Sequence, residues 1–204
     1  MEWIETRTGL AIIFILAIAL FFLHKRTRNP FKATLEKASA GDAKAQYEMG
    51  LLYYRGKYTK QDYAQALNWF DTAAKNGSIP AMNALAGLYN AGHGCEPNPE
   101  KTFYWYQMAA ALNDFEARVN LAICYVQGIG IEADPAKGFG IMKAAADDRS
   151  PIAQTLTAQL YEKGIGVEKN EKSALQYYLL AAKQGEPMAK RRIKELQQEA
   201  LRRH

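Results

Sequence analysis

The side chains that most often carry catalysis or bind metals are scarce in this sequence. Its three histidines are His24, His93 and His204, and none has a second histidine, a cysteine or a carboxylate at metal-ligand spacing. No nucleophile stands beside a base, and no glycine loop has the pattern that cradles phosphates. We therefore predict that the protein is not an enzyme. We expect no catalytic residue, no metal site, no cofactor and no small-molecule substrate.

The rest of the sequence is organised by a period of 36 residues. A small residue opens each copy, a tyrosine stands near the end of the first predicted helix, and a glycine follows it: Ala45, Ala81, Ala117, Ala153 and Ala189; Tyr53, Tyr89, Tyr125 and Tyr161; Gly56, Gly92, Gly128 and Gly164. A typical helix N-cap residue then begins the second helix, at Asp62, Asn98, Asp134 and Asn170. The period predicts four helix pairs, over 42–77, 78–113, 114–149 and 150–185.

The run Gly50-x-x-Tyr53-x-x-Gly56, with Gly128-x-Gly130 and Gly164-x-Gly166 in later copies, resembles the Sel1-like repeat, a relative of the tetratricopeptide repeat. The resemblance covers residues 42–186. It implies an all-α fold, a right-handed α-solenoid of four helix pairs. We expect a lead-in helix over 31–41 before the repeats and a capping helix over 187–204 after them. The resemblance also implies an adaptor that holds partner proteins.

A binding surface is predicted from the same resemblance. In tetratricopeptide arrays the first helices line a concave face, and the inward positions fall six, three and two residues before the conserved tyrosine and one and two after it. These positions differ in chemistry between copies, and asparagines beside a cation can hold an extended peptide. The predicted partner-binding residues are Tyr47, Tyr54, Arg55, Asn83, Asn90, Gln127 and Gln159, with Val126, Thr155 and Glu162 in the same set. The alternative is that all of them are ordinary solvated helix positions.

The distribution of charge argues against a nucleic-acid partner. The formal net charge is +5, but residues 1–32 hold five Lys and Arg against two Glu, and residues 189–204 hold six against two. Residues 33–188 therefore carry a formal charge of −2, so the repeats lack the basic stripe of a nucleic-acid surface. The last predicted helix has a narrow apolar stripe of Ala189, Ile193, Leu196 and Ala200, which is typical of a terminal cap. Its basic face is the alternative binding surface.

The two cysteines occupy apolar positions of the repeat. Cys95 stands where other copies have Ile131 and Val167, and Cys124 where they have leucine. Both are therefore expected to be structural rather than reactive. Some secreted members of the family staple each helix pair with a disulfide, and this sequence has no such cysteine pair.

An apolar run from Gly9 to Leu23 precedes the repeats. A fifteen-residue helix spans roughly 22 Å, and the run can be extended by interfacial residues on its N-terminal side. A cleaved signal peptide would need a positive start and small residues after the run, but the chain begins MEWIETR and continues HKRTR. We therefore predict an uncleaved transmembrane anchor over residues 1–30. Its membrane-flanking residues are Arg7, Lys25, Arg26 and Arg28.

The basic residues after the run predict that the repeats face the cytoplasm of a bacterium, from a single span in the inner membrane. The leading hypothesis is a membrane-anchored adaptor that binds a protein or peptide on its concave face. A second hypothesis places the same adaptor in the periplasm, where it would serve envelope or cell-wall machinery. The least favoured one is a hydrolase.

Overall fold

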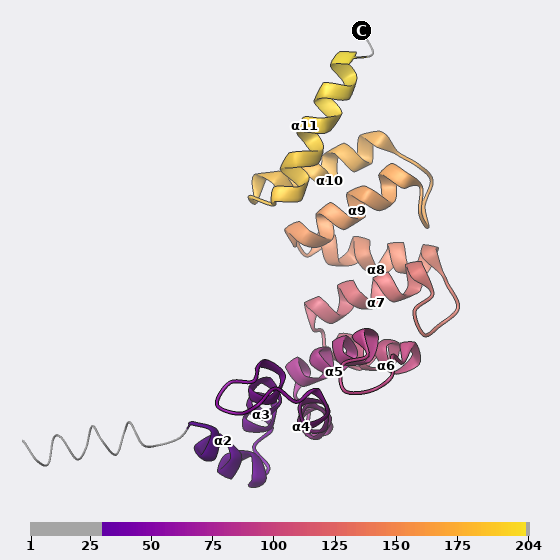
Figure 1. Ribbon diagram of the computed structural model, residues 1–204. Helices are drawn as coiled ribbons and strands as arrows, with labels where there is room; N and C mark the ends of the chain where they lie inside the picture. Colours follow the sequence, from indigo (N-terminus) through magenta and orange to yellow (C-terminus); the bar gives the residue numbers. More distant parts are fainter. Residues whose placement is uncertain (1–29, 203–204) are drawn as a thin grey trace, which may run out of the picture. The chain divides into compact units, whose positions relative to one another are not determined.

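The computed structural model describes residues 30–202, and all regular structure within this range is helical. The predicted all-α solenoid of helix pairs is confirmed. Two compact units divide the chain at Asn76 and Gly77, and their described parts hold α2–α4 and α5–α11 (Figure 1). The helices are α2 (Pro30–Ser39), α3 (Ala43–Arg55), α4 (Tyr63–Lys75), α5 (Ile79–Ala91), α6 (Pro99–Ala111), α7 (Phe115–Gln127), α8 (Pro135–Asp147), α9 (Pro151–Lys163), α10 (Glu171–Lys183) and α11 (Pro187–Arg202).

Local sequence signals begin and end these helices. Each second helix (α4, α6, α8 and α10) starts after an N-cap side chain that accepts a hydrogen bond from the backbone N–H three residues later; the four caps are Asp62, Asn98, Asp134 and Asn170. Each first helix (α3, α5, α7 and α9) ends at a glycine in the left-handed conformation, with φ between 65° and 73°. The periodic residues therefore fix where each second helix begins and where each first helix ends.

Helix α2 of the first unit has the features of a second helix. The Phe31 ring meets the Tyr53 ring edge-on, with centroids 5.6 Å apart. The same pair recurs in the second unit as Phe103 with Tyr125 and Phe139 with Tyr161, at 5.4 and 5.0 Å. Phe31 precedes these phenylalanines by two and three repeat periods. The predicted lead-in helix is therefore the second half of a repeat, which packs on α3 through the buried Ala38.

A buried polar side chain joins successive helices in several repeats. Gln46 donates to the Ala38 carbonyl at the end of α2 and accepts from Asn76 at the end of α4, at 3.1 and 2.8 Å. Gln154 makes the equivalent bonds to Ala146 and Gln184. An ion pair between Arg118 and Asp148 (2.6 Å) occupies the corresponding place in the third repeat. Because buried polar groups need such partners, these contacts favour one register of stacking.

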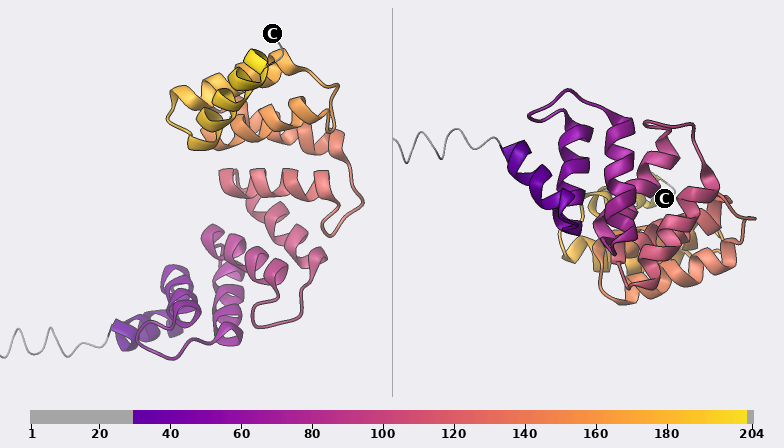
Figure 2. Two further views of the ribbon diagram at one scale, coloured as in Figure 1. Left: turned by 45° about the horizontal axis from the view of Figure 1, so that its top comes forward. Right: turned by 90° about the horizontal axis from the view of Figure 1, so that it is seen from below.

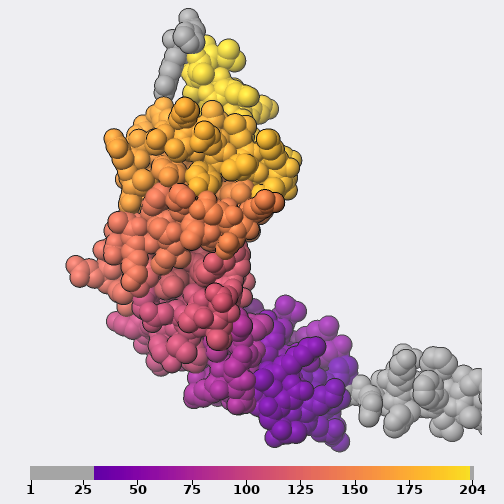
Figure 3. Space-filling view, turned by 180° about the vertical axis from the view of Figure 1, so that it is seen from behind, coloured from indigo at the N-terminus to yellow at the C-terminus, as the bar shows by residue number. Residues whose placement is uncertain are grey.

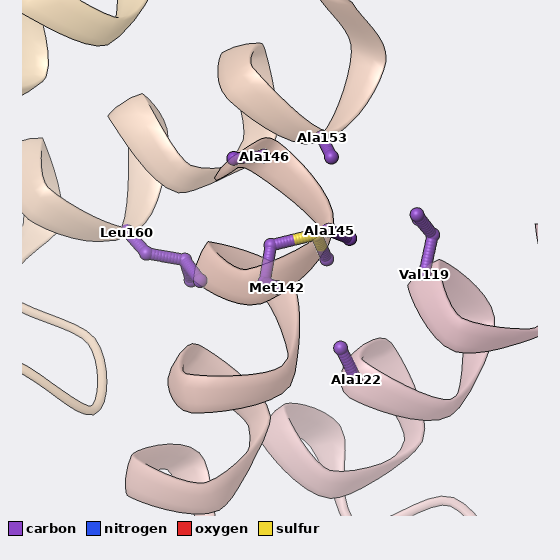
Figure 4. Close-up of a cluster of buried hydrophobic side chains, with 7 residues drawn as sticks. All are labelled: Val119, Ala122, Met142, Ala145, Ala146, Ala153 and Leu160. Atoms are coloured by element: carbon purple, nitrogen blue, oxygen red, sulfur yellow. The ribbon is translucent and has the colours of Figure 1, made fainter. Parts of the chain in front are cut away.

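The second unit, α5–α11, is a stack of antiparallel helices (Figures 1 and 2), with one buried cluster among α7, α8 and α9 and another among α9, α10 and α11. Figure 4 shows one section of this core, where Val119 and Ala122 of α7 lie near Met142 and Ala145 of α8 and Ala153 of α9. Small residues fill the sites where helices approach most closely. In the space-filling view the repeats of this unit follow one another as adjoining bands, from magenta to yellow (Figure 3). Each helix pair therefore buries its apolar face against the next pair.

The last helix of the second unit matches the predicted cap. Its apolar stripe packs on α10 through Ala189, Ile193 and Leu196. In the fourth repeat, Thr155 and Ala158 of α9 are buried on the side that faces α10. Their equivalents in α11 are Arg191 and Lys194, which are exposed. The charged side chains make this face of α11 suited to solvent rather than to another helix.

The predicted transmembrane anchor, with its flanking residues Arg7, Lys25, Arg26 and Arg28, lies outside the described residues. Among the helices of residues 30–202, none is both long enough and apolar enough to cross a membrane.

Candidate functional site

Grooves recur at one place in the repeat, where a first helix lies beside the preceding helices. In the first unit a groove of about 200 Å³ is lined by residues of α2 and α3, among them Pro30, Leu52 and Arg55. In the second unit a groove of about 210 Å³, the central groove, lies between α7 and α9. A larger groove of about 700 Å³, the terminal groove, lies between α9, α10 and α11. The residue three periods after Arg55 is Lys163, which lines both grooves of the second unit.

The central groove combines an apolar floor with a polar rim. The floor consists of Ile123, Val126, Met142, Leu156, Leu160 and Ile165. The rim carries two amides, Gln127 and Gln159, and the ammonium of Lys163. Over residues 30–202, none of these three side chains has a hydrogen bond or an ion pair with the rest of the chain. An apolar floor with donors and acceptors around it that make no hydrogen bond within the chain is suited to binding a ligand.

The terminal groove is ionic. The Arg192 guanidinium donates to Glu162, and also to Glu195 and Glu199 at 3.1 and 3.0 Å. The Tyr178 hydroxyl donates to the second oxygen of Glu162 at 2.7 Å. Burial acts to raise the pKa of Glu162, but the bonds from Arg192 and Tyr178 outweigh it and hold this pKa below its ordinary value of 4.5. The bonds therefore stabilise α11 against α9 at neutral pH, and this contribution is lost as the pH falls through the lowered pKa.

The structure places three of the predicted partner-binding residues in grooves. Gln127 of α7 and Gln159 of α9 both line the central groove, and Gln159 also lines the terminal groove. Arg55 lines the groove of the first unit. Val126 and Glu162, from the same predicted set, also line grooves. These side chains stand two before, one after or two after the repeat tyrosine.

The position six residues before the tyrosine does not line any of these grooves. Tyr47 packs on Phe70 of its own repeat, with ring centroids 5.6 Å apart. Thr155 is buried and donates to the Pro151 carbonyl. Asn83 is half-buried and donates to the Asp114 carboxylate at 2.8 Å. The expectation that this position faces inward is corrected, because a Sel1 first helix turns it toward other helices of the array.

The two remaining predicted residues lie outside the three grooves described above. The Tyr54 ring lies 5.3 Å from that of Tyr63, so part of its surface is covered within the first unit. Asn90 is exposed near the end of α5. Neither contributes to the central groove.

We expect Asn83→Ala to destabilise the second unit by about 1–2 kcal/mol. The substitution removes a hydrogen bond to a charged group, and the Asp114 oxygen that loses it is the one that caps α7. Asn90→Ala is the matched control on the same helix and should change stability by less than about 0.5 kcal/mol. Urea titrations followed by circular dichroism compare the two. Equal stability of both variants would contradict a structural role for Asn83.

Several groove residues escaped sequence reasoning. Ile123, Leu156 and Ile165 form much of the apolar floor, yet they were not among the predicted site residues. A signal was present: Ile123 and Val126 add a second apolar pair, spaced by three, beside the core stripe of the same helix. A helix with apolar residues outside its core-facing stripe exposes apolar surface that can bind a partner.

The residues that line the three grooves include no histidine and no cysteine. Within residues 30–202 no group of three His, Cys, Asp or Glu side chains is placed to hold a metal ion. Both cysteines are free thiols. Burial raises the pKa of Cys124 to about 11, so at neutral pH it is a protonated core side chain, in agreement with its predicted structural role.

The repeat type is the feature that identifies the protein class. The chain matches the Sel1 repeat family over residues 43–78, 79–114, 115–149 and 151–186, together more than half of its length. It belongs to the Sel1 repeat family. Sel1 repeat proteins are scaffolds for interactions between proteins and are generally not catalytic.

Among solved structures, the chain is similar to a protective antigen of uropathogenic Escherichia coli, with a TM-score of 0.73 and 32% identity over 78% of this chain and 34% of that one. A Sel1 repeat protein from Oxalobacter formigenes has a TM-score of 0.69 and 29% identity, over 74% of this chain and 62% of that one.

Two curated proteins match shorter segments. The secretory immunoglobulin A-binding protein EsiB of Escherichia coli is 47% identical over 38 residues, which is 19% of this chain. The ERAD-associated ubiquitin-ligase component HRD3A of Arabidopsis thaliana is 37% identical over 59 residues, or 28% of this chain. The matches span only 8% and 9% of these curated relatives.

Proposed function

We propose that this protein is a membrane-anchored scaffold that binds a segment of a partner protein in the central groove. One observation carries the proposal: an apolar floor between α7 and α9 is left open and is rimmed by Gln127, Gln159 and Lys163, none of which makes a side-chain hydrogen bond or a salt bridge within the described part of the chain. Two relatives are consistent with a binding role. EsiB binds immunoglobulin A, and HRD3A is a component of a ubiquitin ligase.

The size of the groove favours a peptide side chain as the group that enters it. A volume of about 210 Å³ is the space of roughly seven water molecules, which suits one large apolar side chain. The two glutamine amides of the rim can donate to and accept from an extended backbone that crosses the groove. The partner segment would therefore place one bulky apolar residue on the floor while its backbone meets the rim.

The beginning of the helical array supports the proposed anchor. The positions of α2 that would face a preceding first helix carry Pro30, Thr34 and Lys37. Their equivalents in α4 are Ala66, Phe70 and Ala73, all buried against α3. Because α2 lacks an apolar face for another helix, the array has no place for the apolar run Gly9–Leu23. We propose that this run crosses the bacterial inner membrane and that the repeats face the cytoplasm.

We expect a photo-reactive amino acid at Gln159 to cross-link the full-length chain to a discrete partner in its native membrane. The matched control replaces Gln176, an exposed glutamine of α10 outside the groove. Once the partner is known, Gln127→Ala with Gln159→Ala should weaken binding by about 1–3 kcal/mol, the value of two hydrogen bonds. Adducts of equal yield from both positions would contradict the groove as the binding site.

A further inference from the structure

We propose that the loop Lys57–Lys60 of the first repeat is a second membrane contact, which binds the anionic headgroups of the bilayer. The inference rests on the proposed anchor and adds a surface of the repeats to it. The loop joins α3 to α4 within the first unit. Its sequence is Lys-Tyr-Thr-Lys.

The chemistry of this loop is unlike that of its three counterparts. Where the first repeat has Lys57, Tyr58 and Lys60, the other loops have His or Ile, then Gly, then Glu: His93, Gly94 and Glu96; Ile129, Gly130 and Glu132; Ile165, Gly166 and Glu168. The first loop therefore replaces a carboxylate with an ammonium and a glycine with an aromatic ring. A tyrosine between two lysines is a combination suited to the membrane interface, where the ring lies at headgroup level.

The backbone conformation at Tyr58 is unfavourable for a tyrosine. Tyr58 has φ of 66°, a left-handed conformation that glycine adopts freely and that an L side chain strains. Its ring gains little burial in return, since 55% of the residue is exposed. The ammonium of the neighbouring Lys57 lies 5.3 Å from the centroid of the ring. Because burial of the ring does not offset this strain, we infer that Tyr58 has a function other than stabilising the fold.

The loop also lies at the correct end of the first unit. Lys57 and Pro30 line the same groove, so the loop is close to the point where α2 begins. The chain from Leu23, the last residue of the apolar run, to Pro30 is seven residues long and can reach at most about 25 Å. A span that ends at Leu23 would therefore hold this end of the unit near the membrane surface.

Charge favours the bilayer over another occupant. The described part of the first unit holds seven Lys and Arg against five Asp and Glu, a formal charge of +2, whereas residues 77–202 hold 14 of each. Lys57 and Lys60 have no carboxylate partner within the described chain. Juxtamembrane lysines bind anionic lipids in proportion to their number. The excess positive charge is thus on the unit that follows the apolar run.

The test measures amine acylation of individual lysines by mass spectrometry, with the full chain in lipid nanodiscs. The discs contain phosphatidylcholine alone or an equal mixture with phosphatidylglycerol. We expect Lys57 and Lys60 to react about fivefold more slowly in the mixed discs, the factor that corresponds to one lipid-bound charge. Lys172 and Lys183, exposed lysines of the second unit, are the internal references and should react equally in both discs.

The variant Tyr58→Gly with Lys60→Glu restores the residue types of the other loops and keeps Lys57 as the reporter. It should melt no lower than the natural chain, because it relieves the left-handed tyrosine, and its Lys57 should lose the protection. Equal reactivity of Lys57 in both discs, with the chain still bound to them, would overturn the loop contact and leave the anchor standing. A chain that associates with neither disc would overturn both. Protection that requires added cytosolic protein would assign the loop to a protein partner instead.

Discussion

Gly166→Ala is expected to unfold much of the second unit, at a cost of roughly 3–5 kcal/mol. Gly166 has φ of 68°, and a Cβ atom on it would overlap the carbonyl group of Pro135, at the start of α8. The loop of the fourth repeat therefore rests directly on the backbone of the third. The added methyl meets backbone rather than a flexible side chain, so the two repeats must separate to admit it. Urea denaturation followed by circular dichroism measures the loss.

The matched control for this prediction is Gly140→Ala. Gly140 lies inside α8, and a Cβ atom there would meet nothing within 4 Å. Alanine should stabilise the helix by about 0.5–1 kcal/mol, because it restricts the unfolded chain more than glycine does. Equal denaturation midpoints for the two alanine variants would show that the contact between Gly166 and Pro135 does not hold the repeats together.

Phe70→Ala is expected to destabilise the first unit by about 3–5 kcal/mol. The ring is 1% exposed, packs on Tyr47 and fills the slot that Gly50 leaves in α3. Its removal leaves a cavity that the small neighbours Ala66 and Ala73 cannot fill. The measurement is thermal and urea unfolding of the full chain. A loss below about 1 kcal/mol would contradict the assignment of Phe70 to the core of this unit.

A second substitution tests the reason for the glycine. A Cβ atom on Gly50 would lie 2.5 Å from the Phe70 ring, so Gly50→Ala should destabilise the natural chain. In the Phe70→Ala background the clash is gone, and the same change should stabilise by about 1 kcal/mol through helix propensity. A change of the same sign in both backgrounds would show that the two residues are not coupled.

The sequence by itself determined the helices and their ends. A period of 36 residues, N-caps such as Asp134 and helix-ending glycines such as Gly164 predicted four helix pairs, and the structure confirms this fold. These signals can be read without a structure because they act within a few residues: a cap bonds to its own helix, and a glycine adopts its own φ. The absence of paired catalytic side chains likewise predicted a binding surface rather than an active site.

Only the tertiary structure decided which faces of the helices remain open. Tyr47, Asn83 and Gln159 were predicted to share one surface, but Tyr47 packs on Phe70, Asn83 bonds to Asp114, and Gln159 lines a groove. The central groove is made by α7 and α9, whose equivalent residues stand 36 apart, with α8 between them in the sequence. Whether a side chain on such a helix lies in the core or at the rim of a groove depends on the angle at which the neighbouring helices pack. No local pattern contains that angle, because it results from contacts between repeats.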